Sequence, residues 1–136
     1  MTAQDFFKDD IFAADAGVQL LEVREGYAKA ELVVGKQHLN AAHRTQGGAI
    51  FTLADLALAA CANSQGKLSF SLSANVTFLR ESGEGDTLTA EAHEKYIGRS
   101  TGYYEVDIIN QTGKLIACFR SSVFRTDKDV PFCISE

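Results

Sequence analysis

Residues 47–66 read GGAIFTLADLALAACANSQG, and this stretch decides the fold. Its apolar residues continue for roughly four to five helical turns before Gly66, which predicts one long central helix. Asp55 is the only charged residue in it, whereas most surface helices carry a whole charged face. Such a helix must be covered nearly all round. Because a sheet can cover only one side, the other side needs a second chain or a ligand.

Downstream of this helix the apolar pattern changes to a period of two, which is typical of strands. The first of these strands is predicted to be half-buried, since polar side chains alternate with an apolar row made of Phe70, Leu72, Ala74, Val76 and Phe78. Three further strands are expected over residues 87–97, 101–109 and 114–124. In the strand over residues 87–97, the core face is expected to include Tyr96.

Upstream of the helix, residues 1–16 are predicted to form an N-terminal helix, because Phe7, Ile11 and Ala14 share one helical stripe. Residues 18–23 and 27–34 are expected to pair as a hairpin. The complete order is αββαββββ with short links, which favours antiparallel neighbours. We therefore predict a single α+β domain over residues 1–136, with residues 126–136 as a loose tail.

The composition is typical of one small globular domain, with 136 residues, of which 46% are apolar and 23% charged. A net charge of -5 argues against nucleic acid as a partner. No apolar stretch reaches the ~20 residues that cross a bilayer, and the N-terminus lacks a secretory pattern, so we expect a cytoplasmic protein without a membrane partner. Three widely spaced cysteines and an isolated His93 predict free thiols and no metal site.

Asp55 and the glycines before it are the candidates for chemistry. Burial of a lone carboxylate raises its pKa above the free value of ~3.9, and carboxylates perturbed in this way are functional candidates. Gly47 and Gly48 open the helix, where unpaired backbone N–H groups are suited to an oxyanion. Gly47 and Asp55 are ~12 Å apart along a helix, so a substrate that touches both lies along it. Two alternatives stay open from the residues alone: an Asp55 that faces solvent, and glycines that serve tight packing.

The region around these residues resembles a known family. Asn40, the triplet 46–48 (QGG) and the run 49–57 (AIFTLADLA) are similar to the signature of hotdog-fold acyl-CoA thioesterases, in particular the phenylacetic-acid-degradation branch. The similarity covers roughly residues 10–125. It continues through four shorter segments, which are residues 62–66, 77–80, 85–88 and 113–117. The family motif usually reads His-Gly-Gly, and here Gln46 replaces the titratable histidine.

This resemblance implies a hotdog fold, in which a strongly curved antiparallel sheet of about six strands wraps around the central helix. It also implies protomers that pair edge to edge, as a homodimer and further as a homotetramer, with their sites at the interface. Asp55 would be the nucleophile or the general base, and the Gly47 amide would polarise the thioester carbonyl. Gln46 and Asn40 would orient the thioester or the water. A hydroxyl near the water would come from Ser73 or Ser71 of the partner subunit's facing strand.

We therefore predict an acyl-CoA thioesterase that hydrolyses an acyl- or aryl-CoA to the free acid and CoA. No cofactor is expected, because CoA enters as part of the substrate. An acidic protein must offer the anionic CoA part a local basic patch, for which the candidates are Arg80, Lys95, Arg99 and Ser100. Two other functions stay open. A hotdog dehydratase would need a catalytic histidine, which Gln46 disfavours, and a non-catalytic module would bind acyl-CoA without turnover.

Overall fold

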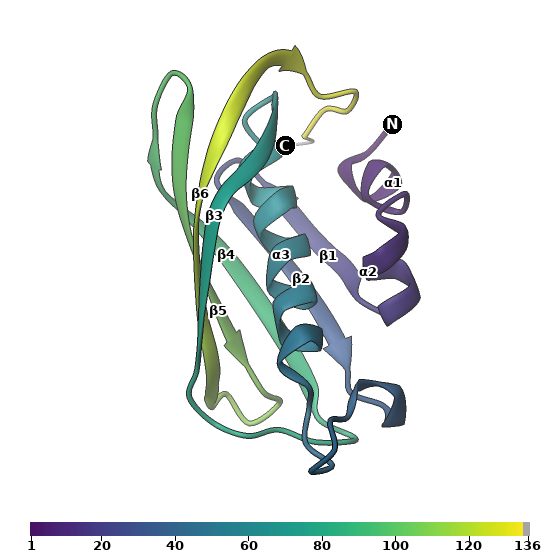
Figure 1. Cartoon of the computed structure of the whole chain (residues 1–136). Helices are drawn as coiled ribbons and strands as arrows, with labels where there is room; N and C mark the ends of the chain where they lie inside the picture. The colour runs from purple at the N-terminus through teal and green to yellow at the C-terminus, as the bar shows by residue number, and fades with distance from the viewer. Residues whose placement is uncertain (135–136) are drawn as a thin grey trace.

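The computed structural model describes residues 1–134 and contains one antiparallel six-stranded sheet, in the order β1-β2-β4-β5-β6-β3. Figure 1 shows the long helix α3 (Gly47–Asn63) lying along one face of this sheet, with two short N-terminal helices beside it. The strands are β1 (Gln19–Arg24), β2 (Tyr27–Val33), β3 (Lys67–Phe78), β4 (Thr87–Ile97), β5 (Thr101–Ile109) and β6 (Leu115–Asp129). The predicted α+β class, central helix and six strands are confirmed. Within residues 1–134, no helix combines the length and the apolar character that a membrane crossing requires.

The N-terminal segment forms two helices rather than the predicted single one. Helix α1 (Ala3–Phe7) begins with a capping box between Thr2 and Asp5, and α2 (Ile11–Ala16) begins after Asp10. The Asp10 carboxylate accepts a hydrogen bond from the Ala13 N–H at 3.1 Å, so it caps a new helix where a continuous one would have passed through. A 3-10 turn, η1 (Lys36–His38), also lies in the polar stretch before α3.

The core lies between α3 and the inner face of the sheet. Alternate residues of the inner strands are fully buried, as the period-two pattern predicts; they include Ala28, Ala30, Leu32, Leu88, Ala90, Ala92, Val106, Ile108, Ala117 and Phe119. Alanine on β2 and β4 allows the α3 backbone to approach these strands closely. Tyr96, expected on this face, is instead 59% exposed. A bulge between Glu94 and Tyr96 shifts the alternation and turns the tyrosine outward.

Strand β3 is the edge of the sheet, and it is more exposed than the predicted half-buried strand. Phe70 is 58% exposed, Leu72 61% and Phe78 52%. Because β6 covers one long side of β3 only, the other side presents unpaired backbone groups. The apolar side chains that the sequence pattern assigned to a buried face of β3 are therefore exposed in the protomer, next to a free strand edge.

The prediction of a loose tail over residues 126–136 is wrong for residues 126–129, because β6 continues to Asp129. Lys67 pairs with Asp129 in the β3–β6 ladder, and their side chains form an ion pair at 2.7 Å. Phe132 is buried and packs against the rings of Phe6 and Phe7 of the N-terminal segment. Residues 135–136 of the predicted tail lie outside the described residues.

Candidate active site

Asp55 lies half-buried on α3 and lines a cavity of about 220 Å³ between this helix and β3. The α3 wall is made by Leu58, Ala59 and Ala62 beside Asp55, and the opposite wall by Ser69, Phe70, Ser71 and Val123. The cavity is large enough to hold water or part of a small ligand. The expectation of a carboxylate in a largely apolar crevice therefore agrees with the position of Asp55.

The surroundings of Asp55 disfavour its charge. Burial raises the pKa of Asp55 above its ordinary value, and repulsion from the Asp10 carboxylate adds to the shift. Within residues 1–134, neither carboxylate oxygen of Asp55 has a hydrogen-bond or ion-pair partner that would offset this effect. A carboxylate that is ionised but poorly solvated is a stronger base than one in water, which suits the activation of water or direct attack.

Gly47 forms the first turn of α3 and lines a different cavity, of about 440 Å³, together with Asn40, Ile50, Phe78 and Arg80. Within the described chain, its N–H has no acceptor. A Cβ at this position would lie 2.9 Å from Cζ of Phe78, so the close packing of this ring also favours glycine here. The donor required for an oxyanion is thus present at the predicted residue.

Gln46 and Asn40 hold the loop and the helix start. Gln46 is the N-cap of α3, and its side-chain oxygen accepts a hydrogen bond from the Gly48 N–H. Its side chain borders a third cavity, of about 430 Å³, which Phe12 and His38 also line. The Asn40 side-chain oxygen accepts hydrogen bonds from the backbone N–H groups of residues 42 and 44, at 2.9 and 3.0 Å. Of these two side chains, Asn40 lines the Gly47 cavity and Gln46 does not.

The two candidate serines lie on opposite faces of β3. Ser71 pairs with Val123, a buried core residue, and lines the Asp55 cavity. Ser73 pairs with Ser122 and bonds to its hydroxyl at 2.8 Å. A spacing of two in the sequence would put both on one face, but a bulge between Ser71 and Ser73 reverses the alternation. Within one protomer it is therefore Ser71 that shares a cavity with Asp55.

The four predicted CoA contacts are divided among three places. Arg80 lines the Gly47 cavity, and Lys95 lies 3.9 Å from Glu105 in an exposed ion pair. Arg99 and Ser100 line a cavity of about 570 Å³ at the far end of β6. Arg125, which lines this cavity, is paired in the β3–β6 ladder with Ser69, which lines the Asp55 cavity.

Two further cations belong to this cavity and were missed by the sequence reasoning. Arg125 and Lys128 line it beside Arg99, with Asp127 as the one acid among the seven lining residues. Arg125 donates to the Gly98 carbonyl at 2.6 Å, but among residues 1–134 no acceptor reaches its buried Nε. Buried donors without a partner are rare in folded proteins. The expected end of β6 at residue 124 had placed both cations outside the sheet.

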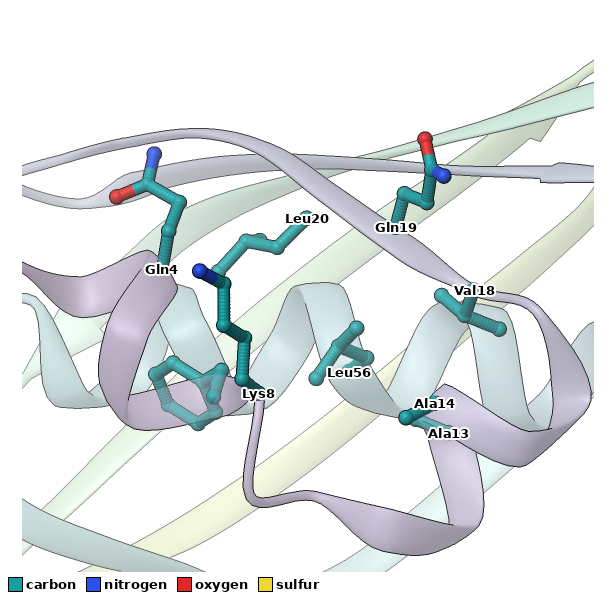
Figure 2. A pocket seen from close by; sticks show the side chains of 9 residues that line it. Gln4, Lys8, Ala13, Ala14, Val18, Gln19, Leu20 and Leu56 are labelled. Carbon is teal, nitrogen blue, oxygen red and sulfur yellow. The ribbon is translucent and has the colours of Figure 1, made fainter.

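A separate cavity, of about 330 Å³, lies where α1, α2 and β1 meet α3 (Figure 2). Figure 2 shows Leu56 of α3 on one side and the polar ends of Gln4, Lys8 and Gln19 on the other. Among the described residues, nine line this cavity, and none of them is a predicted catalytic or CoA-contact residue. We therefore do not place the reaction in it.

With this geometry established, comparison with known proteins gives the family. The Thioesterase superfamily model matches residues 45–117, which include Gln46, Gly47, Asp55, Ser71 and Ser73. The chain belongs to the thioesterase superfamily. Acyl-coenzyme A thioesterase PaaI of Escherichia coli is 37% identical over 123 residues, which cover 90% of this chain and 88% of that protein. A protein of Archaeoglobus fulgidus is 42% identical over 125 residues, covering 92% of this chain and 81% of the relative.

Solved structures agree with this assignment. The structure of the E. coli PaaI protein from the phenylacetic acid degradation operon superposes with a TM-score of 0.88 at 34% identity, covering 98% of this chain and 94% of that chain. A Streptococcus pneumoniae thioesterase structure with coenzyme A has a TM-score of 0.82 at 27% identity, with coverages of 88% and 96%. The predicted PaaI-like branch and hotdog fold are confirmed, and the thioesterase superfamily member is a thioester hydrolase by class.

Proposed function

We propose that this thioesterase superfamily member hydrolyses an acyl- or aryl-CoA thioester to the free acid and CoA, with Asp55 as the group that starts the reaction. The observation that carries this proposal is the carboxylate of Asp55, which is half-buried, unpaired within the described chain and adjacent to a cavity. No cofactor is required, since a thioester is already an activated acyl group.

The reaction needs a base or nucleophile and a donor for the carbonyl oxygen. In the general-base route, Asp55 takes a proton from water as the water oxygen bonds to the carbonyl carbon. The negative charge that develops on the carbonyl oxygen is stabilised by a Gly47 N–H of the second copy, because Gly47 and Asp55 of one chain are ~12 Å apart along α3. The C–S bond then breaks, and the CoA sulfur leaves as a thiolate. In the nucleophilic route, Asp55 attacks the same carbon and water hydrolyses the resulting anhydride. Gln46 and Asn40 orient the thioester or the water, and Ser71 or Ser73 supplies the hydroxyl.

The phosphates of CoA bind in the cavity of Arg99 and Ser100, with Arg125 and Lys128 as added contacts. Three cations against one acid give this cavity a net positive charge on a protein whose net charge is -5. Phosphate oxygens accept charge-assisted hydrogen bonds from arginine and lysine side chains of this kind. Arg80 and Lys95 are secondary contacts, because Lys95 is already paired with Glu105.

The working unit is proposed to be a homodimer that pairs through β3, and further a homotetramer. A partner strand would satisfy the free edge of β3 and cover its exposed Leu72. Because Phe70 and Ser71 of β3 line the Asp55 cavity, such pairing brings the second copy next to that cavity. Asp55 and Gly47 of one protomer line separate cavities, which supports a site completed at the interface.

The experiment is thiol release from a panel of acyl- and aryl-CoAs, followed together with binding of the same compounds. Release of equal amounts of free thiol and free acid supports the hydrolase. Tight retention of acyl-CoA with no thiol release would instead support a binding module. Conversion of a hydroxyacyl thioester to the unsaturated thioester, with the thioester intact, would support the dehydratase.

A further inference from the structure

Asn63 lies at the last turn of α3 and is almost fully buried, with 3% of its surface exposed. Its side-chain oxygen accepts a hydrogen bond from the Ser69 N–H at 2.8 Å, and its Nδ2 donates to the Ser69 carbonyl at 3.4 Å. The same Nδ2 donates to the Ala59 carbonyl at 2.8 Å. A buried amide with three bonds of this kind holds two segments at a fixed distance.

Both of its partners border the Asp55 cavity. Ala59 belongs to the α3 wall, four residues after Asp55, and Ser69 belongs to the β3 wall, two residues before Ser71. Asn63 thus connects the two walls by hydrogen bonds, although the residues that form these walls come from different elements of the chain.

The β3–β6 ladder is irregular where β3 borders the Asp55 cavity. Its register is irregular between Lys67 and Ser69 and again between Ser71 and Ser73. On its other side β3 has no neighbouring strand in the described protomer. At Ser69, the two bonds from Asn63 take the place that the backbone of a neighbouring strand would occupy.

From this geometry we propose that Asn63 is a positioning residue, which holds β3 at the distance from α3 that keeps Ser71 opposite Asp55 and keeps the cavity narrow. It acts through Ser69 and touches neither the substrate nor the reacting atoms. This proposal rests on the proposed role of Asp55. Asn63 would affect the reaction only through the position of β3, because its side chain takes no part in the chemical step.

Ser64 provides a matched control. It is the next residue, is 4% exposed, and also anchors the end of α3: its hydroxyl donates to the Cys61 carbonyl at 2.6 Å and accepts from the Gly26 N–H at 2.9 Å. It ties the helix to the β1–β2 turn rather than to β3. A general loosening of the helix end would therefore affect Asn63 and Ser64 variants alike.

The test compares Asn63→Ala, Asn63→Ser and Ser64→Ala in the full chain, at a temperature where thermal melts show all of them folded. Asn63→Ser is included as a second variant because its hydroxyl can still bond to the Ala59 carbonyl within the helix, while both amide bonds to Ser69 are lost. We expect kcat to fall about a hundredfold in the Asn63 variants, as for a small misplacement of a reacting group, with KM nearly unchanged. We expect the acid limb of their pH–rate profile to move to lower pH, because water then reaches Asp55.

Ser64→Ala is expected to retain kcat within about threefold and to keep the wild-type pH profile. Equal losses of kcat in the Asn63 and Ser64 variants, or wild-type kinetics in the Asn63 variants, would overturn the proposal. Asp55→Asn is measured in parallel: if it is as active as the wild type, the proposed function fails, whereas an inactive Asp55→Asn with unaffected Asn63 variants refutes the positioning role alone.

Discussion

Asp55 combines a desolvated position with an unpaired carboxylate, and its protonation controls the proposed reaction. Since its pKa is raised, mainly by burial and further by Asp10, the reactive ionised form is lost at a higher pH than for an ordinary aspartate. We predict that kcat falls as the pH drops through this raised pKa. In Asp10→Asn the repulsion is removed while the N-cap is kept, because Asn caps as well as Asp. The acid limb of kcat should therefore move to lower pH, as measured by pH–rate profiles of both proteins.

Gly47 is predicted to stabilise the developing oxyanion through its backbone N–H. The alternative is that glycine matters here only because it leaves room for Phe78. Gly47→Pro removes the N–H at a helix position that tolerates proline, after a residue that already has extended backbone angles. We expect kcat to fall by about 10²–10³-fold, as for loss of one oxyanion donor. Gly47→Ala introduces the same crowding against Phe78 but keeps the N–H. Equal activity of the two variants, measured by thiol release, would refute the role of the N–H.

Arg125 is predicted to contribute to CoA binding rather than to the chemical step. Arg125→Gln should raise KM for acyl-CoA by about tenfold or more, the value of a hydrogen bond to a charged group, with kcat nearly unchanged. The same substitution should have little effect on a truncated acyl-pantetheine thioester, which lacks the nucleotide phosphates. A KM effect of the same size on both substrates would show that Arg125 acts on structure and not on the phosphates.

At the scale of elements, β3 has exposed apolar side chains and a free edge that nothing in the protomer covers. We predict that this strand pairs with a second copy of the chain. Leu72→Lys places a charge on the free edge, where it opposes pairing. We expect a monomer by sedimentation and a loss of activity of about a hundredfold, because the site is then incomplete. The control is Ile11→Lys, which replaces an apolar residue of similar exposure on α2, outside the cavities of the candidate site. It should leave both assembly and activity as in the wild type.

The elements also show where sequence patterns suffice. The inner strands follow from their period of two, because burial on one face sets which residue types alternate. The central helix follows from a continuous apolar run that ends at a glycine. The break between α1 and α2 depends on Asp10 acting as a cap, and a capping aspartate is not distinguishable from an exposed helical one by periodicity. The separation of Ser71 from Ser73 depends on a bulge, which is fixed by pairing with β6 and leaves no periodic signal.

At the scale of the whole molecule, the candidate site combines parts that are distant in sequence. Asp55 and Gly47 stand out as candidates from the sequence, since both lie in one helix whose composition is unusual, and their roles stay predictions. Arg125 was not, because its relevance arises only when β6 continues past residue 124 and places it beside Arg99 and Ser69. A position of this kind follows from strand pairing and cannot be read from local residue types.

The ionised form of Asp55 also has a consequence for the stability of the whole chain. A folded-state pKa raised above the unfolded value means that the folded protein holds the proton more tightly, so the contribution of this group to stability falls as the pH rises through the interval between the two values. At neutral pH, Asp55→Asn removes this unfavourable ionisation. Its Tm at pH 7 should therefore equal or exceed that of the wild type.

The most direct test of Asp55 as the reactive group is the kcat of Asp55→Asn on the best acyl-CoA substrate, with Asp10→Asn as the matched control for loss of one carboxylate. The account predicts that kcat falls by about 10²–10⁴-fold in Asp55→Asn, the range for removal of a general base, while Tm and assembly are retained and Asp10→Asn stays active. A folded Asp55→Asn that releases thiol at the wild-type rate would contradict it.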